Sequence, residues 1–165
     1  LDIQDWLAFG LFNLLTLVLM ILALIDFKHK VLPTPLVQLA FLIILSLLLT
    51  FWAGGHNISD SAVRALSGAL VGGGPFFILY QVSDGKWIGG GDVRLGAVLG
   101  LMLGPIGAYG MLFGASLLGL AAIIPSRLIS GAPVRKANFA FGPFLMVAAL
   151  AIFLGSHHLA WSPIA

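Results

Sequence analysis

The stretch GGGDVRLGAVLGLMLG at residues 89–104 decides the fold, because it combines an apolar run with glycines at helical spacing. Gly96, Gly100 and Gly104 follow Asp92 at intervals of four residues, and residues four apart lie on one face of a helix. Small residues at this spacing allow two membrane helices to approach backbone to backbone. We therefore expect Asp92 to stand at the top of a packing face, with its carboxylate directed at a neighbouring helix and not into lipid.

The composition of the whole chain is that of a membrane protein. Of the 165 residues, 60% are hydrophobic and 8% are charged, whereas soluble domains have roughly 45–50% apolar and about 25% charged residues. This balance excludes a soluble globular protein, and a formal net charge of +2 provides no basic patch for nucleic acid. The predicted class is an all-α polytopic membrane protein with a single transmembrane domain over residues 1–165.

Two residue types are missing from the chain: it has no Cys, and all six acidic residues are Asp. Without Cys there is no disulfide framework, thiolate metal site or cysteine nucleophile. Without Glu the chain lacks the H-E-x-x-H pattern of zinc proteases, which needs a Glu as the base.

Apolar stretches of about 20 residues are long enough to cross a hydrocarbon core of roughly 30 Å. Gly104-Pro105 separates a short fourth stretch from the fifth, and a single bent helix over 91–124 would instead reverse the topology beyond it. The six predicted spans are 6–26, 35–53, 61–82, 91–104, 106–124 and 140–156.

Positive charge is concentrated on one side of these spans. The connections at 27–34, 83–90 and 125–139, with the first turn of the fourth span, carry seven of the eight Lys and Arg residues, and Arg64 alone falls on the other side. Cytoplasmic loops carry the excess of Lys and Arg. The sequence therefore predicts that these three connections face the cytoplasm and that both termini face outward.

Three acids fall at the cytoplasmic ends of spans, where acids are rare and often functional. Asp84 lies in a Ser-Asp-Gly-Lys sequence that is typical of a polar turn. Asp26 ends the first span, and alone it can be explained as an aspartate neutralised by Lys28 or Lys30. Asp92 alone can be explained as a helix cap. Because Asp26 and Asp92 share one depth and one membrane face, we consider them together as a candidate pair.

These residues carry a resemblance to the type IV prepilin peptidases. Asp26-Phe27-Lys28, with Pro33 seven residues after the Asp, resembles the first-aspartate motif of that family. Gly89-Gly90-Gly91-Asp92-Val93-Arg94-Leu95, with Gly100 following, resembles its G-x-G-D motif. Phe141-Gly142-Pro143-Phe144-Leu145 is similar to the segment that opens its last span.

The sequence departs from the family pattern at three points. Arg94 stands where the family usually has Lys, and Lys86 stands where many bacterial members have Glu. Many relatives also have an N-terminal cytoplasmic portion with paired cysteines that is linked to N-methylation of the product. Because this chain has no Cys, its residues give no basis for predicting methyltransferase activity.

The resemblance implies an aspartic endopeptidase in the bacterial inner membrane that cleaves the short cytoplasmic leader of prepilins or pseudopilins, without a metal or other cofactor. Asp26 and Asp92 are the catalytic candidates. Backbone of Gly89, Gly90, Gly91, Gly142 and Pro143 is expected to support an extended substrate, and Lys28, Pro33 and Arg94 are expected to support the motifs.

The expected chemistry follows from two neighbouring carboxylates, which cannot both ionise easily and therefore share a proton. The ionised acid activates a water and the protonated acid donates to the scissile carbonyl and then to the leaving nitrogen. Helix dipoles suggest that Asp92, at a helix start, is the ionised member and that Asp26, at a helix end, is protonated.

Other interpretations remain open. Gly72-Gly73-Gly74-Pro75 interrupts the third span, as in a transporter or a non-enzymatic scaffold, although we interpret it as a packing kink. Gly114-Ala115-Ser116 with His157 or His158 resembles a rhomboid serine protease only weakly, because Leu117 follows the Ser. Signal peptide peptidase and presenilin pair G-x-G-D with Tyr-Asp, whereas Ile25 precedes Asp26, and this chain lacks their Pro-Ala-Leu.

Overall fold

The computed structural model describes residues 3–29, 31–53, 58–130 and 141–159, and all the regular secondary structure in these ranges is helical. The helices follow the apolar stretches. A helix pairs the backbone polar groups of such a stretch internally, which lipid requires. They are α1 (Ile3–His29), α2 (Thr34–Ala53), α3 (Ile58–Val82), α4 (Gly90–Ser130) and α5 (Gly142–Leu159).

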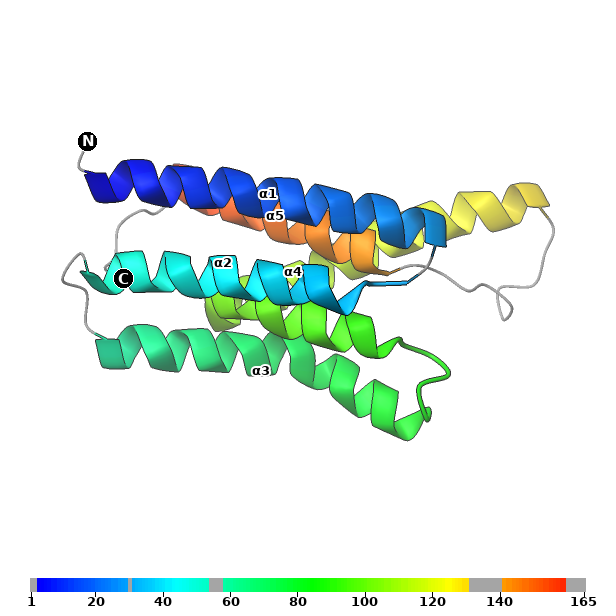
Figure 1. The fold of residues 1–165 in the computed structure, drawn as a ribbon. Coiled ribbons are helices and arrows are strands. Elements are labelled where there is room, and N and C mark those ends of the chain that lie inside the picture. The colour runs from blue at the N-terminus through cyan, green and yellow to red at the C-terminus, as the bar shows by residue number, and fades with distance from the viewer. Residues whose placement is uncertain (1–2, 30, 54–57, 131–140, 160–165) are drawn as a thin grey trace.

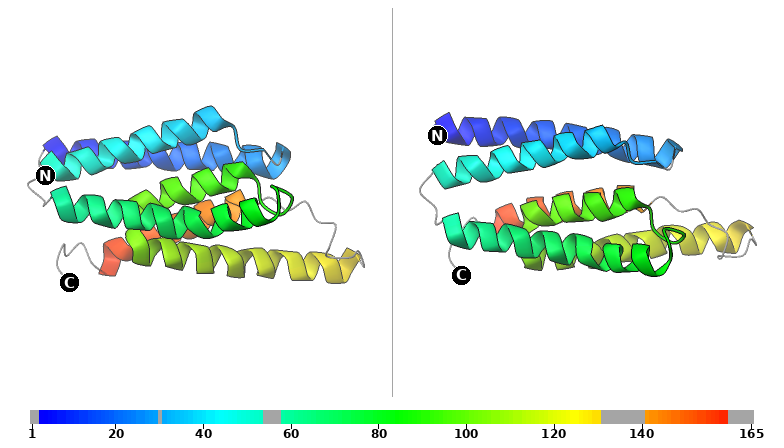
Figure 2. Two further views of the ribbon diagram at one scale, coloured as in Figure 1. Left: turned by 90° about the horizontal axis from the view of Figure 1, so that it is seen from below. Right: turned by 60° about the horizontal axis from the view of Figure 1, so that its bottom comes forward.

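Helix α4 has two arms, residues 90–103 and 105–130, which meet at Gly104. Gly104 has φ 70° and ψ 179°, a conformation that is essentially restricted to glycine. Pro105 then opens the second arm, where its fixed φ suits a first helical position. The arms run in opposite directions (Figures 1 and 2). The predicted break at Gly104-Pro105 is confirmed, but the second arm continues beyond the predicted end at residue 124.

With the arms counted separately, successive helices alternate in direction along the bundle (Figures 1 and 2). One end of the bundle, here the aspartate end, contains the last turn of α1 and the first turns of α4 and α5. The first turn of α1 and the last turn of α5 lie at the opposite end. This arrangement brings together three chain segments that are far apart in the sequence.

The α3–α4 interface is built from glycines. A Cβ on Gly72 would lie 3.2 Å from the Cα of Gly100, and a Cβ on Gly68 would meet the carbonyl oxygen of Gly100. Gly96 makes the corresponding close approach to the carbonyl oxygen of Gly72. The predicted packing face of α4 is therefore confirmed, and Gly72 of the Gly-Gly-Gly-Pro segment packs against it.

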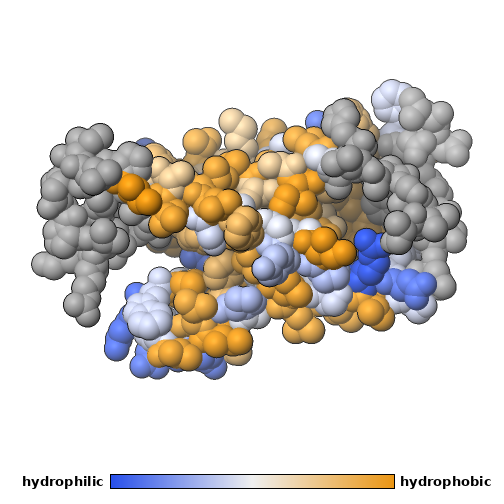
Figure 3. Space-filling view, turned by 180° about the vertical axis from the view of Figure 1, so that it is seen from behind, coloured by the Kyte–Doolittle hydropathy of each residue, from blue (hydrophilic) through white to orange (hydrophobic). Residues whose placement is uncertain are grey.

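The remaining core is aliphatic and joins α1, α2, α4 and α5. The largest fully buried side chains are Leu15, Leu19, Leu22, Ile44, Leu95, Leu99, Met111, Leu145 and Met146. On the outside, apolar side chains cover much of the face in Figure 3. A large apolar outer surface is expected where lipid is the solvent.

Three described helical segments are long and apolar enough to cross a membrane: Trp6–His29, Ile58–Val82 and Gly90–Ala122. Thr34–Thr50 and Gly142–Gly155 are shorter apolar helices. The prediction of six full spans is thus met only in part. The first arm of α4 is only about 21 Å long at 1.5 Å per residue, shorter than a hydrocarbon core of roughly 30 Å.

Candidate active site

Asp26 lies in the last turn of α1, which continues to His29. Its side chain is only 5% exposed, although Lys28 and His29 beside it are exposed. Burial of an acid is costly unless polar groups compensate it. The backbone amide of Gly142 interacts with the Asp26 carboxylate, yet Oδ2 is buried without a hydrogen-bond partner among the described residues.

Asp92 lies in the first turn of α4 and is half-buried. Its backbone N–H donates to the carbonyl of Gly89 at 3.1 Å, which starts the helix. The backbone amide of Gly89 also interacts with the Asp92 carboxylate. Gly91 has no room for a side chain, since its Cβ would lie 2.8 Å from the Cβ of Leu32. The connection between α1 and α2 therefore packs against the start of α4.

The two carboxylates meet beside Gly142, the first residue of α5. A Cβ on Gly142 would contact Oδ2 of Asp26 and would lie 3.5 Å from Oδ1 of Asp92. Since both oxygens lie within 3.5 Å of one point, they are separated by no more than twice that distance. The two acids also interact electrostatically. Acids this close influence each other's ionisation, and together they can transfer protons to and from a small molecule held between them.

Comparison with known proteins identifies the family of the chain. The sequence profile of the type IV leader peptidase family matches residues 13–124, which is more than half of the chain and includes both aspartates. The chain belongs to the type IV leader peptidase family. It is 34% identical over 157 residues to a prepilin leader peptidase/N-methyltransferase of Neisseria gonorrhoeae.

That alignment covers 90% of this chain and 49% of the relative, so the chain spans about half the length of this curated protein. No solved structure matches the chain. The family match ends at residue 124 and does not include the start of α5. The contact of Gly142 with Asp26 is thus a finding of the structure alone.

The start of α5 is held in place by an aromatic contact. The rings of Phe141 and Phe76 of α3 lie edge to face, with centroids 5.6 Å apart and an interplanar angle of 66°. The carbonyl of Phe141 accepts a hydrogen bond from the N–H of Phe144 at 3.1 Å. Pro143 occupies the first helical turn, which its missing N–H suits. Sequence reasoning did not identify Phe76, and only its apolar character hints at a buried position.

The residues that are expected to support the motifs of this peptidase family member lie around the same end. Arg94 Nη1 donates to Thr34 Oγ1 at 3.3 Å, which links the first arm of α4 to the start of α2. The carbonyl of Pro33 accepts from the N–H of Leu36 at 3.1 Å and thereby begins α2. Lys28 is exposed. Leu32 and Thr34, which sequence reasoning missed, flank Pro33.

Asp84 does not join the pair. It lies in the turn after α3, where Asp84 has φ 50° and Gly85 has φ 72°. The N–H of Gly85 donates to the carbonyl of Tyr80 at 2.9 Å and closes the turn. The side chain of Asp84 is exposed. The interpretation of this segment as a polar turn is confirmed.

The residues of the rhomboid-like alternative form no described site. Ser116 lies in the second arm of α4, and its hydroxyl donates to the carbonyl of Leu112 of the same helix at 2.7 Å. The side chains of His157 and His158 lie outside the described part of the structure. Within the described ranges, no group of three or more His, Asp, Glu or Cys residues is placed to hold a metal ion.

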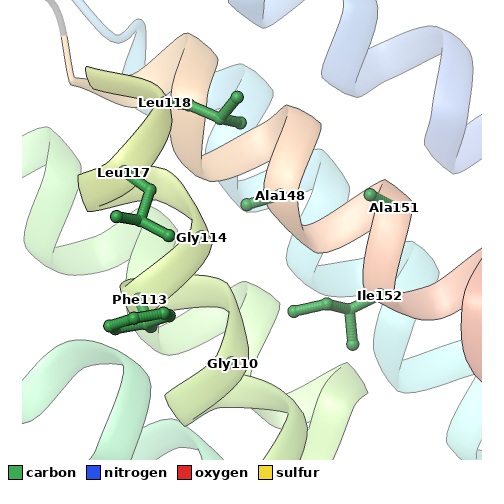
Figure 4. Close-up of a pocket in the computed structure, with 8 residues that line it drawn as sticks. All are labelled: Gly110, Phe113, Gly114, Leu117, Leu118, Ala148, Ala151 and Ile152. Atoms are coloured by element: carbon green, nitrogen blue, oxygen red, sulfur yellow. The ribbon is translucent and has the colours of Figure 1, made fainter. Parts of the chain in front are cut away.

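A pocket between the second arm of α4 and α5 has no polar or titratable side chain among its lining residues (Figure 4). Its lining is apolar throughout, with glycine and alanine backbone between larger side chains. The lining residues are Gly110, Phe113, Gly114, Leu117, Leu118, Ala148, Ala151 and Ile152.

Proposed function

We propose that this chain is a membrane aspartic endopeptidase that removes the short leader from type IV prepilins or pseudopilins. The observation that carries the proposal is the convergence of Asp26 and Asp92 on one point beside Gly142. Membership of the leader peptidase family supports the substrate class. The prepilin leader peptidase named among its relatives supports the same reaction.

In the proposed reaction the two carboxyl groups share one proton. The ionised member takes a proton from a water molecule while the oxygen of that water bonds to the scissile carbonyl carbon. The protonated member donates its proton to the carbonyl oxygen. Collapse of the tetrahedral intermediate breaks the C–N bond. A carboxyl proton passes to the leaving nitrogen, and a carboxylate takes back one proton from a hydroxyl of the intermediate. The cycle thus consumes one water and leaves a free acid, a free amine and the acid pair in its starting state.

We assign the ionised role to Asp92. It lies in the first turn of α4, where the helix dipole favours negative charge. Asp26 is near the end of α1, where the dipole of its own helix opposes negative charge, and it takes the protonated role. Because the acids titrate as a pair, this assignment describes one microstate.

We further propose that the chain forms a single domain in the bacterial inner membrane, with six crossings, outward termini and the aspartate end in the cytoplasm. The exposed Lys28, Lys86 and Arg94 all lie at that end, which supports the orientation. Because the chain has no Cys, Lys86→Cys gives a single labelling site. A membrane-impermeant thiol reagent should label it from the cytoplasmic side, and labelling from the outer side would contradict the orientation.

The extended leader needs exposed backbone with which to pair, and we propose Gly89–Gly91 and Gly142-Pro143 for this support. Gly89 precedes α4 and is exposed. A photocrosslinker on Gly90→Cys should form an adduct with a prepilin leader peptide, since a Cβ there would be 3.7 Å from Tyr80, an ordinary contact. Gly155→Cys, near the other end of α5, is the control. No adduct from position 90 would refute this support.

Cleavage of a prepilin by purified protein tests the proposed function. Asp26→Asn and Asp92→Asn should each lower the cleavage rate at least about 100-fold, because each removes a group that transfers a proton. Asp84→Asn, in the exposed turn after α3, should retain normal activity. Near-normal cleavage by either of the first two variants would end the proposal. No cleavage by the unmodified protein would favour a scaffold or transporter module.

A further inference from the structure

The Cα of Gly142 lies beside the carboxylates of both Asp26 and Asp92. Gly142 is buried at the start of α5. The direction in which its side chain would extend leads to Oδ2 of Asp26 and then, at 3.5 Å, to Oδ1 of Asp92. No other residue supplies one of the three nearest atoms to that position. A glycine at this position therefore allows the carboxylate of Asp26 to lie against the start of α5.

The Asp26 oxygen nearest to Gly142 lacks a hydrogen-bond partner among the described residues. Oδ2 of Asp26 is buried and has no such partner, and Asp26 as a whole is only 5% exposed. A buried polar oxygen without a partner is rare and needs an explanation. Here the oxygen points toward the position that both acids border.

We infer that Gly142 is a positioning residue, whose lack of a side chain allows the Asp26 carboxylate to lie against the start of α5 and close to Asp92. This inference rests on the proposed function. The requirement at position 142 is therefore for the absence of a side chain.

The partner of a side chain at position 142 determines what such a side chain would do. The first atom that it meets is the end of the Asp26 carboxylate, which can rotate away, and not backbone. The fold should therefore tolerate Gly142→Ala, while the carboxylate of Asp26 moves away from its position beside Asp92. A displacement of about 1 Å at a reacting group can lower the rate about 100-fold.

The contact between Phe141 and Phe76 holds the start of α5, and with it Gly142, in place. Phe76 is buried in α3, one turn beyond the glycine interface with α4, and its ring meets that of Phe141 edge to face. The same bundle contact that places Asp92 thus also places Gly142. Loss of the Phe141 ring should loosen the start of α5 without adding an atom beside the carboxylates.

The test compares Gly142→Ala with Gly155→Ala, since both sites lie in α5 and a Cβ on Gly155 meets nothing within 4 Å. With a prepilin substrate, Gly142→Ala should lower kcat about 100-fold and leave KM and the thermal unfolding temperature nearly unchanged. Gly155→Ala should match the unmodified protein. A purely structural role would instead lower the unfolding temperature or raise KM.

Normal kcat for Gly142→Ala, in a preparation whose unmodified protein cleaves, would overturn the inference and leave the proposed function intact. Absence of cleavage by the unmodified protein would instead refute the proposed function. If Gly142→Ala does not fold, Phe141→Leu provides the second variant. It should lower kcat with little change in KM, and normal kcat for this variant would also overturn the inference.

Discussion

Glycines are essential in two regions of this molecule, but a side chain would meet different neighbours in each. In the α3–α4 interface, a Cβ on Gly68 or Gly100 would meet backbone atoms of the other helix. At the aspartate end, a Cβ on Gly142 would meet the tip of a carboxylate. Backbone atoms in a packed interface cannot move alone, whereas a carboxylate can rotate. The comparison separates glycines that maintain the fold from a glycine that maintains the site.

The largest effect on stability is expected in the interface. Gly100→Ala would place a Cβ against the carbonyl oxygen of Gly68 and 3.2 Å from the Cα of Ala69, so the helices must separate. We expect a loss of about 1–3 kcal/mol in the free energy of unfolding, measured by denaturation in detergent. Gly10→Ala is the control, because a Cβ there meets nothing within 4 Å. Equal stability of the two variants would contradict the comparison.

A smaller effect is expected where the α1–α2 connection packs on α4. Gly91→Ala would bring a Cβ to 2.8 Å from the Cβ of Leu32 and displace the connection that follows Asp26. We expect cleavage to fall about tenfold or more, since small misplacements near reacting groups are costly. Gly74→Ala in α3, where a Cβ meets nothing within 4 Å, should cleave nearly normally. If both variants cleave alike, the packing of Leu32 does not position the pair.

The smallest effect is expected for the polar link between α4 and α2. Thr34→Val removes the oxygen that accepts from Arg94 at 3.3 Å and keeps the shape of the side chain. Because Arg94 is exposed, the loss should be at most about 1 kcal/mol of stability, measured by thermal unfolding. A loss comparable with that of Gly100→Ala would mean that the two regions are not distinct.

The sequence predicts the features that depend on local spacing. Helical intervals of four place Asp92 above Gly96 and Gly100, and this face packs on α3 as expected. The break at Gly104-Pro105 is predicted because glycine and proline both interrupt helices, and Gly104 is indeed non-helical. The turn at Asp84 follows from its polar composition. The family resemblance adds the pairing of Asp26 with Asp92, which spacing alone left open.

Contacts between distant segments could not be predicted in this way. Nothing in the local pattern indicates that Gly142 meets Asp26, more than a hundred residues earlier, or that Phe76 meets Phe141. The length of the second arm of α4 was underestimated because hydrophobicity falls before the helix ends. The first arm of α4 is apolar like the other predicted spans but shorter, so its crossing of the membrane stays a prediction.

The central claim is that Asp26 and Asp92 act as one unit, and a double-substitution experiment tests it most directly. The cleavage rates of Asp26→Asn, Asp92→Asn and the variant with both changes are compared with that of the unmodified protein. Groups that act together in catalysis give strongly non-additive losses. We predict that the double variant is no slower than the slower single variant. Losses that multiply in the double variant would contradict the claim, because they would mean that each acid acts independently.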